Sequence, residues 1–138
     1  LNSTLEPDKE KTMVFWILAC FAVYLFYVFS TGMILFARVG PSAYMGPRDN
    51  LPEQSVYYER AKKAAMNFSE TLPIFLGLAI LSLVQEDADL AMAQFGATLY
   101  VLARLFYFPI YVSGLPVVRS IVFMPVLIGL GIMAVALI

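Results

Sequence analysis

Four long apolar segments separated by short polar connections leave this 138-residue chain few ways to fold. A helix needs about 20 apolar residues to cross a bilayer, so four such helices would use nearly the whole chain. Hydrophobic residues make up 61% of the sequence and charged residues 14%, against about 25% charged residues in soluble domains. We therefore predict an all-α integral membrane protein. Residues 1–138 would form a single four-helix domain, with helices at about 13–37, 55–84, 90–112 and 117–138.

The residue content argues against several kinds of chemistry. The sequence has no histidine, which excludes His-ligated haem and any Ser-His or Cys-His dyad. Cys20 is the only cysteine, so an intrachain disulfide is impossible and a structural zinc site is not expected. The net charge of −1 gives no basic footprint for nucleic acid. We expect no metal and no nucleic-acid partner, and chemistry that uses Arg, Lys, Glu, Tyr, Ser or a group carried by the ligand.

The distribution of Lys and Arg predicts the orientation of the chain in the membrane. The first connection and the start of the second helix contain five basic residues: Arg38, Arg48, Arg60, Lys62 and Lys63. The second connection contains only acidic residues, and the third has Arg119 at its edge. Because cytoplasmic connections carry an excess of Lys and Arg, the first and third connections should be cytoplasmic. Both termini should then lie on the opposite side.

Two sets of polar residues interrupt the apolar segments with helical spacing. One set, at i, i+3, i+7 and i+10, is Arg60, Lys63, Asn67 and Glu70. The other, at i, i+3 and i+7, is Arg104, Tyr107 and Tyr111. Each set lies on one helix face. Ionisable groups are costly at membrane depth and usually mark a functional site, so a small polar, anionic ligand is expected between the helices.

Structural explanations compete with this interpretation. Lys62 and Lys63 could extend to the lipid headgroups. Arg104 and Glu70 could form a buried ion pair that holds the bundle in register. The two tyrosines could belong to an aromatic belt at the membrane surface, although they share a face with Arg104. The convergence of cations from all four helices at one membrane level favours a pocket, and these cations are Arg38, Lys63, Arg104 and Arg119.

Three sequence motifs resemble those of the MAPEG superfamily, the membrane-associated proteins in eicosanoid and glutathione metabolism. The segment from Glu59 to Leu76, ERAKKAAMNFSETLPIFL, is similar to the second-helix signature of that family. The segment 103–111, ARLFYFPIY, resembles its third-helix motif, and Arg119-Ser120 is like the opening of its fourth helix. The connection from Arg38 to Pro52 is similar to that of bacterial members. The resemblance therefore covers the chain from about Arg38 to its end.

The resemblance implies a homotrimer in a bacterial inner membrane, with glutathione bound between adjacent subunits. The residues that would hold the tripeptide are Arg38, Lys63, Asn67, Glu70, Arg104, Tyr107 and Tyr111. Arg119 would be the catalytic residue, placed beside the sulfur to stabilise its thiolate. Glutathione has two carboxylates and one ammonium, so several cations and one carboxylate would complement it. Lys63 departs from the family pattern, since many members have Arg there, and Thr71 replaces an aromatic hydroxyl.

The expected function is that of a glutathione transferase or peroxidase. Its substrates would be lipophilic electrophiles or lipid hydroperoxides that arrive from the bilayer. An alternative is a non-catalytic MAPEG-fold subunit that scaffolds a partner complex and uses the polar stripes as structural ion pairs. A transporter is a third possibility, which four helices of this length make difficult within one subunit.

Overall fold

The computed structural model describes residues 6–138, and within that range every long element is helical. The helices are α1 (Glu6–Met45), α2 (Val56–Val84), α3 (Leu90–Ser113) and α4 (Pro116–Val135), with a short 3-10 turn, η1 (Arg48–Asn50). By length and composition, all four helices are able to cross a membrane. The predicted all-helical fold with four membrane-spanning segments is confirmed. The chain is an integral, multi-pass membrane protein.

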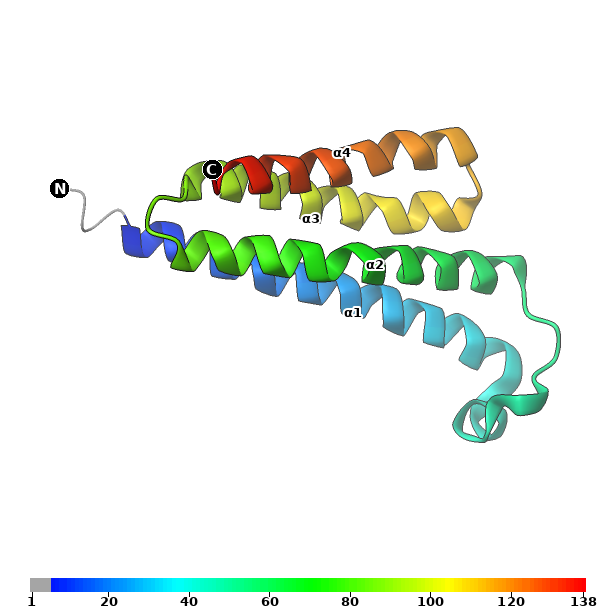
Figure 1. Ribbon diagram of the computed structural model, residues 1–138. Helices are drawn as coiled ribbons and strands as arrows, with labels where there is room; N and C mark the ends of the chain where they lie inside the picture. Colours follow the sequence, from blue (N-terminus) through cyan, green and yellow to red (C-terminus); the bar gives the residue numbers. More distant parts are fainter. Residues whose placement is uncertain (1–5) are drawn as a thin grey trace.

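Successive helices run in opposite directions and form an up-down-up-down bundle (Figure 1). The packing between α3 and α4 is the most extensive, and α1 lies against α2 and α3. Within residues 6–138, α1 and α4 do not pack against each other. The start of α2, the end of α3 and the start of α4 lie at one end of the bundle (Figure 1). This arrangement brings the predicted polar stripes towards a common end.

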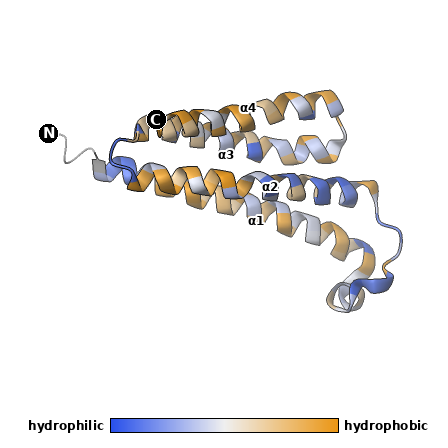
Figure 2. Cartoon of the chain, viewed as in Figure 1, coloured by the Kyte–Doolittle hydropathy of each residue, from blue (hydrophilic) through white to orange (hydrophobic). Residues whose placement is uncertain are grey.

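The outer surface of the bundle is largely apolar. Figure 2 shows hydrophobic residues along α1 and α4, and hydrophilic residues gathered at the connections and in the first half of α2. Large side chains point outward, including Phe29 at 68% exposed, Phe95 at 64% and Ile121 at 63%. Contiguous apolar surface of this kind is unfavourable in water, whereas lipid chains cover it without cost.

The first helix is longer than predicted at both ends. It begins at Glu6 rather than at about residue 13, and it continues past residue 37 to Met45. Gly40 interrupts it with φ of 78° and ψ of 173°, a conformation that only glycine adopts readily, and Pro41 follows. The helix therefore breaks at this dipeptide, but the chain then resumes a helical conformation up to Met45. Tyr44 then packs back on Phe36, with ring centroids 5.5 Å apart.

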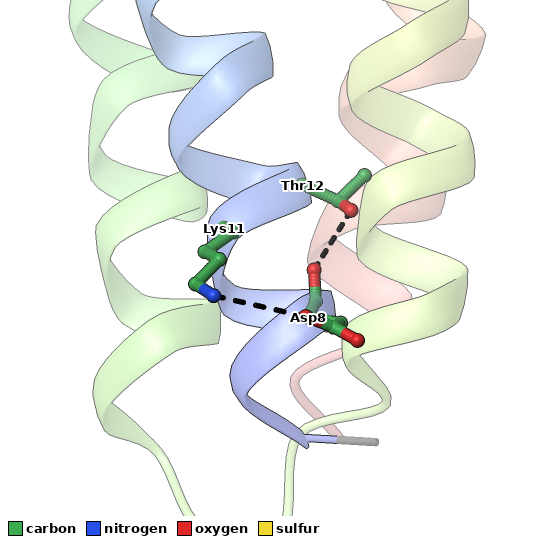
Figure 3. Close-up of polar contacts among 3 residues, drawn as sticks. All are labelled: Asp8, Lys11 and Thr12. Atoms are coloured by element: carbon green, nitrogen blue, oxygen red, sulfur yellow. Dashed lines mark hydrogen bonds and ion pairs between the residues drawn. The ribbon is translucent and has the colours of Figure 1, made fainter. Parts of the chain in front are cut away.

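Polar residues occupy the extra turns at the start of α1 (Figure 3). The hydroxyl of Thr12 donates a hydrogen bond of 2.8 Å to the carbonyl oxygen of Asp8. Lys11 Nζ lies 3.8 Å from Asp8 Oδ1, and both side chains are about four-fifths exposed. An exposed pair of this kind contributes little to stability. These turns therefore extend the helix beyond its apolar span without adding to the core.

A direct backbone contact joins α3 to α4. A Cβ atom on Gly129 would lie 2.7 Å from the carbonyl oxygen of Gly96, and one on Gly96 would lie 2.6 Å from that of Gly129. Both distances are shorter than real Cβ contacts. The two helices can approach this closely only because both positions are glycine, as in other membrane bundles with small residues at helix contacts.

Candidate functional site

Two adjoining pockets lie at the end of the bundle where α3 ends and α4 begins. The first, which we call the tyrosine pocket, has a volume of about 420 Å³ and is lined by Asn67, Tyr107, Tyr111, Arg119, Ser120, Phe123 and Met124. The second, which we call the cationic pocket, has a volume of about 230 Å³ and is lined by Arg60, Lys63, Tyr111, Gly114, Leu115, Pro116 and Arg119. Tyr111 and Arg119 line both pockets, so they form one continuous candidate site.

A larger cavity of about 480 Å³ lies at the opposite end of the bundle. Its walls are formed by the start of α1 and the connection between α2 and α3, with side chains of both charges. It contains none of the predicted site residues. The two pockets that share Tyr111 and Arg119 are therefore the better candidate, because they bring together cationic and hydrogen-bonding side chains from α2, α3 and α4.

The two pockets are rich in positive charge and hydrogen-bond donors. Arg60, Lys63 and Arg119 line the cationic pocket, and neither lining contains an acidic residue. The guanidinium carbon of Arg119 lies 5.0 Å from the centre of the Tyr111 ring, a cation–π contact that orients the arginine at the junction of the pockets. Like charges placed together repel each other, so an anion bound among them is stabilised.

Arg60 connects α2 to the end of α3 and forms one wall of the cationic pocket. Its Nη1 donates a hydrogen bond of 3.2 Å to the carbonyl oxygen of Val112, one of the last in α3. Gly114 ends that helix with φ of 80°, and a Cβ atom there would lie 2.6 Å from the guanidinium. Arg60 was not among the predicted binding residues. The sequence feature that could have identified Arg60 is its position on the polar face of α2, with Lys63 and Asn67.

Arg104 is fully buried behind the tyrosine pocket. Its Nη1 donates to Asn67 Oδ1 at 2.8 Å, and its Nη2 donates to Asn67 O at 3.2 Å and to Thr71 Oγ1 at 2.5 Å. The two predicted stripes therefore meet through Arg104 and Asn67. The hydroxyl of Tyr27 on α1 donates to the carbonyl oxygen of Arg104, which also ties α1 to this region.

Aromatic rings surround the guanidinium of Arg104. Its central carbon lies 4.9 to 5.6 Å from the ring centres of Phe68, Tyr100, Tyr107 and Phe123. Tyr107 and Phe123 also line the tyrosine pocket, so these rings lie between the buried charge and the pocket. Tyr100 is fully buried, and its hydroxyl lies 2.8 Å from Thr71 Oγ1. Cation–π contacts partly compensate a guanidinium for the loss of water.

The predicted site residues separate into three groups. Those that line the pockets are Lys63, Asn67, Tyr107, Tyr111 and Arg119. Arg104 lies behind them. Arg38 and Glu70 lie outside the pockets of this chain and are exposed. Arg38 Nε donates instead to the carbonyl oxygen of Glu53 at 2.9 Å.

The ion pair considered for Arg104 and Glu70 does not form among the described residues, where the one ion pair is that of Lys11 with Asp8. Helix geometry explains this result. Successive residues differ by about 100° around the axis, so Glu70 and Thr71 flank the direction of Asn67 on opposite sides. Packing turns Thr71 inward to Arg104, which turns Glu70 outward. Thr71 was noted only as a departure from a motif, and its i+4 relation to Asn67 was the available signal.

The chemistry of the site suits an anionic ligand. Guanidinium and ammonium groups donate hydrogen bonds and do not accept them. The hydroxyls of tyrosine and serine are also able to donate hydrogen bonds. Within residues 6–138 no cluster of three or more Cys, Asp or Glu side chains could hold a metal ion. A ligand here would be recognised by charge and hydrogen bonding, at a site whose outer surroundings are apolar.

Comparisons with known proteins agree with the motifs. No curated protein matches the sequence closely. The sequence matches the MAPEG family over residues 13–138, a range that includes most of α1, the other three helices and both pockets. The chain therefore belongs to the MAPEG family.

Proposed function

We propose that this protein is a membrane glutathione transferase or peroxidase that activates the glutathione thiolate for attack on lipophilic electrophiles or lipid hydroperoxides. The observation that carries the proposal is the continuous site at the end of the bundle, in which three cations line one pocket and no acid lines either. Family membership supports glutathione as the anion, because many MAPEG members are glutathione-dependent enzymes. Glutathione is a co-substrate in this proposal, and no metal takes part.

Each pocket matches a different part of the tripeptide. Lys63 and Arg60 in the cationic pocket suit a carboxylate of glutathione. Asn67, Tyr107 and Ser120 in the tyrosine pocket offer hydrogen bonds to the peptide groups. Arg119 lines both pockets and is assigned to the sulfur. A guanidinium beside a thiol favours the thiolate, which is the nucleophilic form.

Two reactions are consistent with this arrangement. In conjugation, the thiol loses its proton to solvent, the thiolate forms a C–S bond with the electrophile, and the leaving group departs with its electron pair. In peroxide reduction, the thiolate attacks the terminal oxygen of a lipid hydroperoxide and breaks the O–O bond. The departing alkoxide takes a proton from solvent and leaves as the alcohol. The resulting sulfenic acid reacts with a second glutathione to give the disulfide and water. Both substrates are lipophilic and would reach the site from the bilayer.

We further propose that the chain is a homotrimer with the site shared between subunits. Glutathione carries an ammonium group, but neither pocket offers a carboxylate. Glu70 and Arg38, both on the predicted list, face outward where a second copy could meet them. Native mass spectrometry in detergent should give the mass of three chains. A monomer that binds glutathione with full affinity would contradict the shared site.

The proposed orientation places the site at the cytoplasmic end of the bundle, where glutathione would have access to it. The end of α1, the connection to α2 and the first turns of α2 together carry five of the nine basic residues, and the same end of the bundle contains the cationic pocket. Cytoplasmic connections are the ones in which Lys and Arg accumulate.

Charge reversal at two neighbouring lysines tests the proposed binding site. Lys63 lines the cationic pocket, whereas Lys62 lines neither pocket, and both side chains are exposed. Lys63→Glu should weaken glutathione binding by about tenfold or more, because it removes a cation and adds repulsion toward a carboxylate. Lys62→Glu makes the same change in net charge and should leave the dissociation constant within about twofold. Isothermal titration calorimetry on detergent-purified protein measures both. Equal losses in the two variants would show that the cationic pocket is not the binding site.

A further inference from the structure

Arg104 is a fully buried cation without a carboxylate partner among residues 6–138. Its terminal nitrogens donate to Asn67 and Thr71 on α2, and its Nε has no hydrogen-bond partner. Burying a charge among neutral groups alone is unfavourable, so we expect Arg104 to have a functional role. The hydrogen bonds from its guanidinium to Asn67 indicate what that role is.

A guanidinium can only donate hydrogen bonds, so the atom of the Asn67 side chain that meets Arg104 Nη1 must be the amide oxygen. The second contact, from Nη2 to the backbone oxygen of Asn67, holds the same residue at another point. Asn67 also lines the tyrosine pocket. With its oxygen engaged by the guanidinium, the group that the amide has left to offer a ligand is Nδ2, which carries two donors.

Thr71, also on α2, makes a further contact with the guanidinium. Its Oγ1 accepts from Arg104 Nη2 at 2.5 Å and lies 2.8 Å from the hydroxyl of Tyr100. Thr71 is itself buried and does not line the tyrosine pocket. Thr71 therefore acts on a ligand in that pocket only indirectly, and the hydrogen-bonded route from Thr71 to the pocket runs through Arg104 and Asn67.

We propose that Arg104, held by Thr71, is a positioning residue that orients the amide of Asn67 so that its N–H donors are available to an anionic ligand in the tyrosine pocket. The orientation follows from the donor-only chemistry of arginine. The identification of the ligand as glutathione rests on the proposed function. In this proposal Arg104 acts on Asn67 and not directly on the ligand, since it is fully buried and does not line the pocket.

The first test replaces the amide of Asn67 with a nearly isosteric carboxylate. In Asn67→Asp, the carboxylate should accept from Arg104 and satisfy the buried charge, so the apparent melting temperature should equal or exceed that of the wild type. Both Nδ2 donors are lost and a negative charge is added, so the dissociation constant for glutathione should rise about tenfold or more. Asn50→Asp, the same change in the exposed turn η1, is the matched control and should alter neither quantity.

The second test is a double-mutant cycle with Thr71→Val and Asn67→Ala. Thr71→Val removes one of the two acceptors of Arg104 Nη2 and keeps the shape of the side chain. In the wild-type background it should raise the dissociation constant for glutathione by roughly threefold to tenfold. In the Asn67→Ala background it should have no further effect on binding, because the amide through which Thr71 acts is absent. A purely structural role would give the same loss in both backgrounds.

The two tests separate failure of this inference from failure of the proposed function. If the wild type binds glutathione, additive effects of Thr71→Val and Asn67→Ala would overturn the positioning role, and so would unchanged binding by Asn67→Asp. If the wild type does not bind glutathione, the proposed function fails. The melting temperatures then test the orientation of Asn67. The Arg104 contact is supported if Asn67→Asp melts at or above the temperature of the wild type and Asn67→Ala melts below it. The contact is overturned if Asn67→Asp melts at a lower temperature than Asn67→Ala.

Discussion

Replacing Arg119 with alanine is expected to lower the turnover number for glutathione conjugation by about 100-fold while raising the dissociation constant for glutathione less than about tenfold. The residue lies at the junction of the two pockets, where it is stacked on Tyr111 at 5.0 Å. Its proposed role is to stabilise the thiolate, whereas Lys63 and Arg60 remain to bind a carboxylate. A loss in turnover that exceeds the loss in binding is therefore the expected pattern.

Steady-state kinetics with an activated aryl chloride, together with calorimetric binding of glutathione, would measure the two quantities separately. Arg48→Ala is the matched control, because Arg48 also makes a cation–π contact, 4.4 Å over Tyr44, but lines neither pocket. It should retain the turnover of the wild type. Unchanged turnover in Arg119→Ala would remove Arg119 from the mechanism.

Gly129→Leu is expected to produce the largest loss of stability, about 3 kcal/mol, because overpacking at this contact cannot be relieved by a change of rotamer. A Cβ atom at this position would already lie 2.7 Å from the carbonyl oxygen of Gly96 and 3.0 Å from the backbone nitrogen of Tyr100. Both neighbours are backbone atoms of α3. The helices would have to separate, which would also shift the wall of the tyrosine pocket that α4 provides.

Gly131→Leu provides the comparison on the same helix, since a Cβ atom at Gly131 has no neighbour within 4 Å. Unfolding of both variants in mixed micelles, followed by circular dichroism, would compare their stabilities. Gly129→Leu should unfold far more readily than Gly131→Leu. Similar stability in the two variants would contradict the close contact between α3 and α4.

The fold could be predicted because the bilayer restricts the chain so strongly. A backbone in lipid must satisfy its hydrogen bonds internally, so long apolar segments become helices, and short connections make neighbouring helices antiparallel. The break at Gly40 was also predictable, since Gly-Pro disfavours a continuing helix. The extra turns of α1 were not, because their polar residues lie outside the apolar pattern that marks a span.

The candidate site could be predicted in part. Helical spacing placed Lys63 and Asn67 on one face and Tyr107 and Tyr111 on another, and these residues do line the pockets. Spacing alone does not determine how each helix is rotated against its neighbours. That rotation decides that Glu70 faces outward, which no periodicity within α2 could reveal.

The roles of Thr71 and Arg60 depended on the same packing. Thr71 contacts α3 through Arg104 Nη2 and the hydroxyl of Tyr100, and Arg60 contacts it through the carbonyl oxygen of Val112. Helical spacing relates each residue to the polar face of α2, but the contacts themselves arise only when two helices take up a particular separation and register. Thr71 in particular looked like a lost aromatic hydroxyl, whereas in the structure it fixes a buried cation.

In the proposed function, the two pockets bind glutathione and hold it as the thiolate. The most direct test is an ultraviolet titration of the detergent-purified wild-type protein with glutathione, recording the thiolate absorbance at a pH where free glutathione is mostly protonated. We expect a saturable thiolate signal that Lys63→Glu weakens and that Lys62→Glu leaves unchanged. A folded protein that gives no saturable signal would contradict the claim and favour a non-catalytic scaffolding subunit.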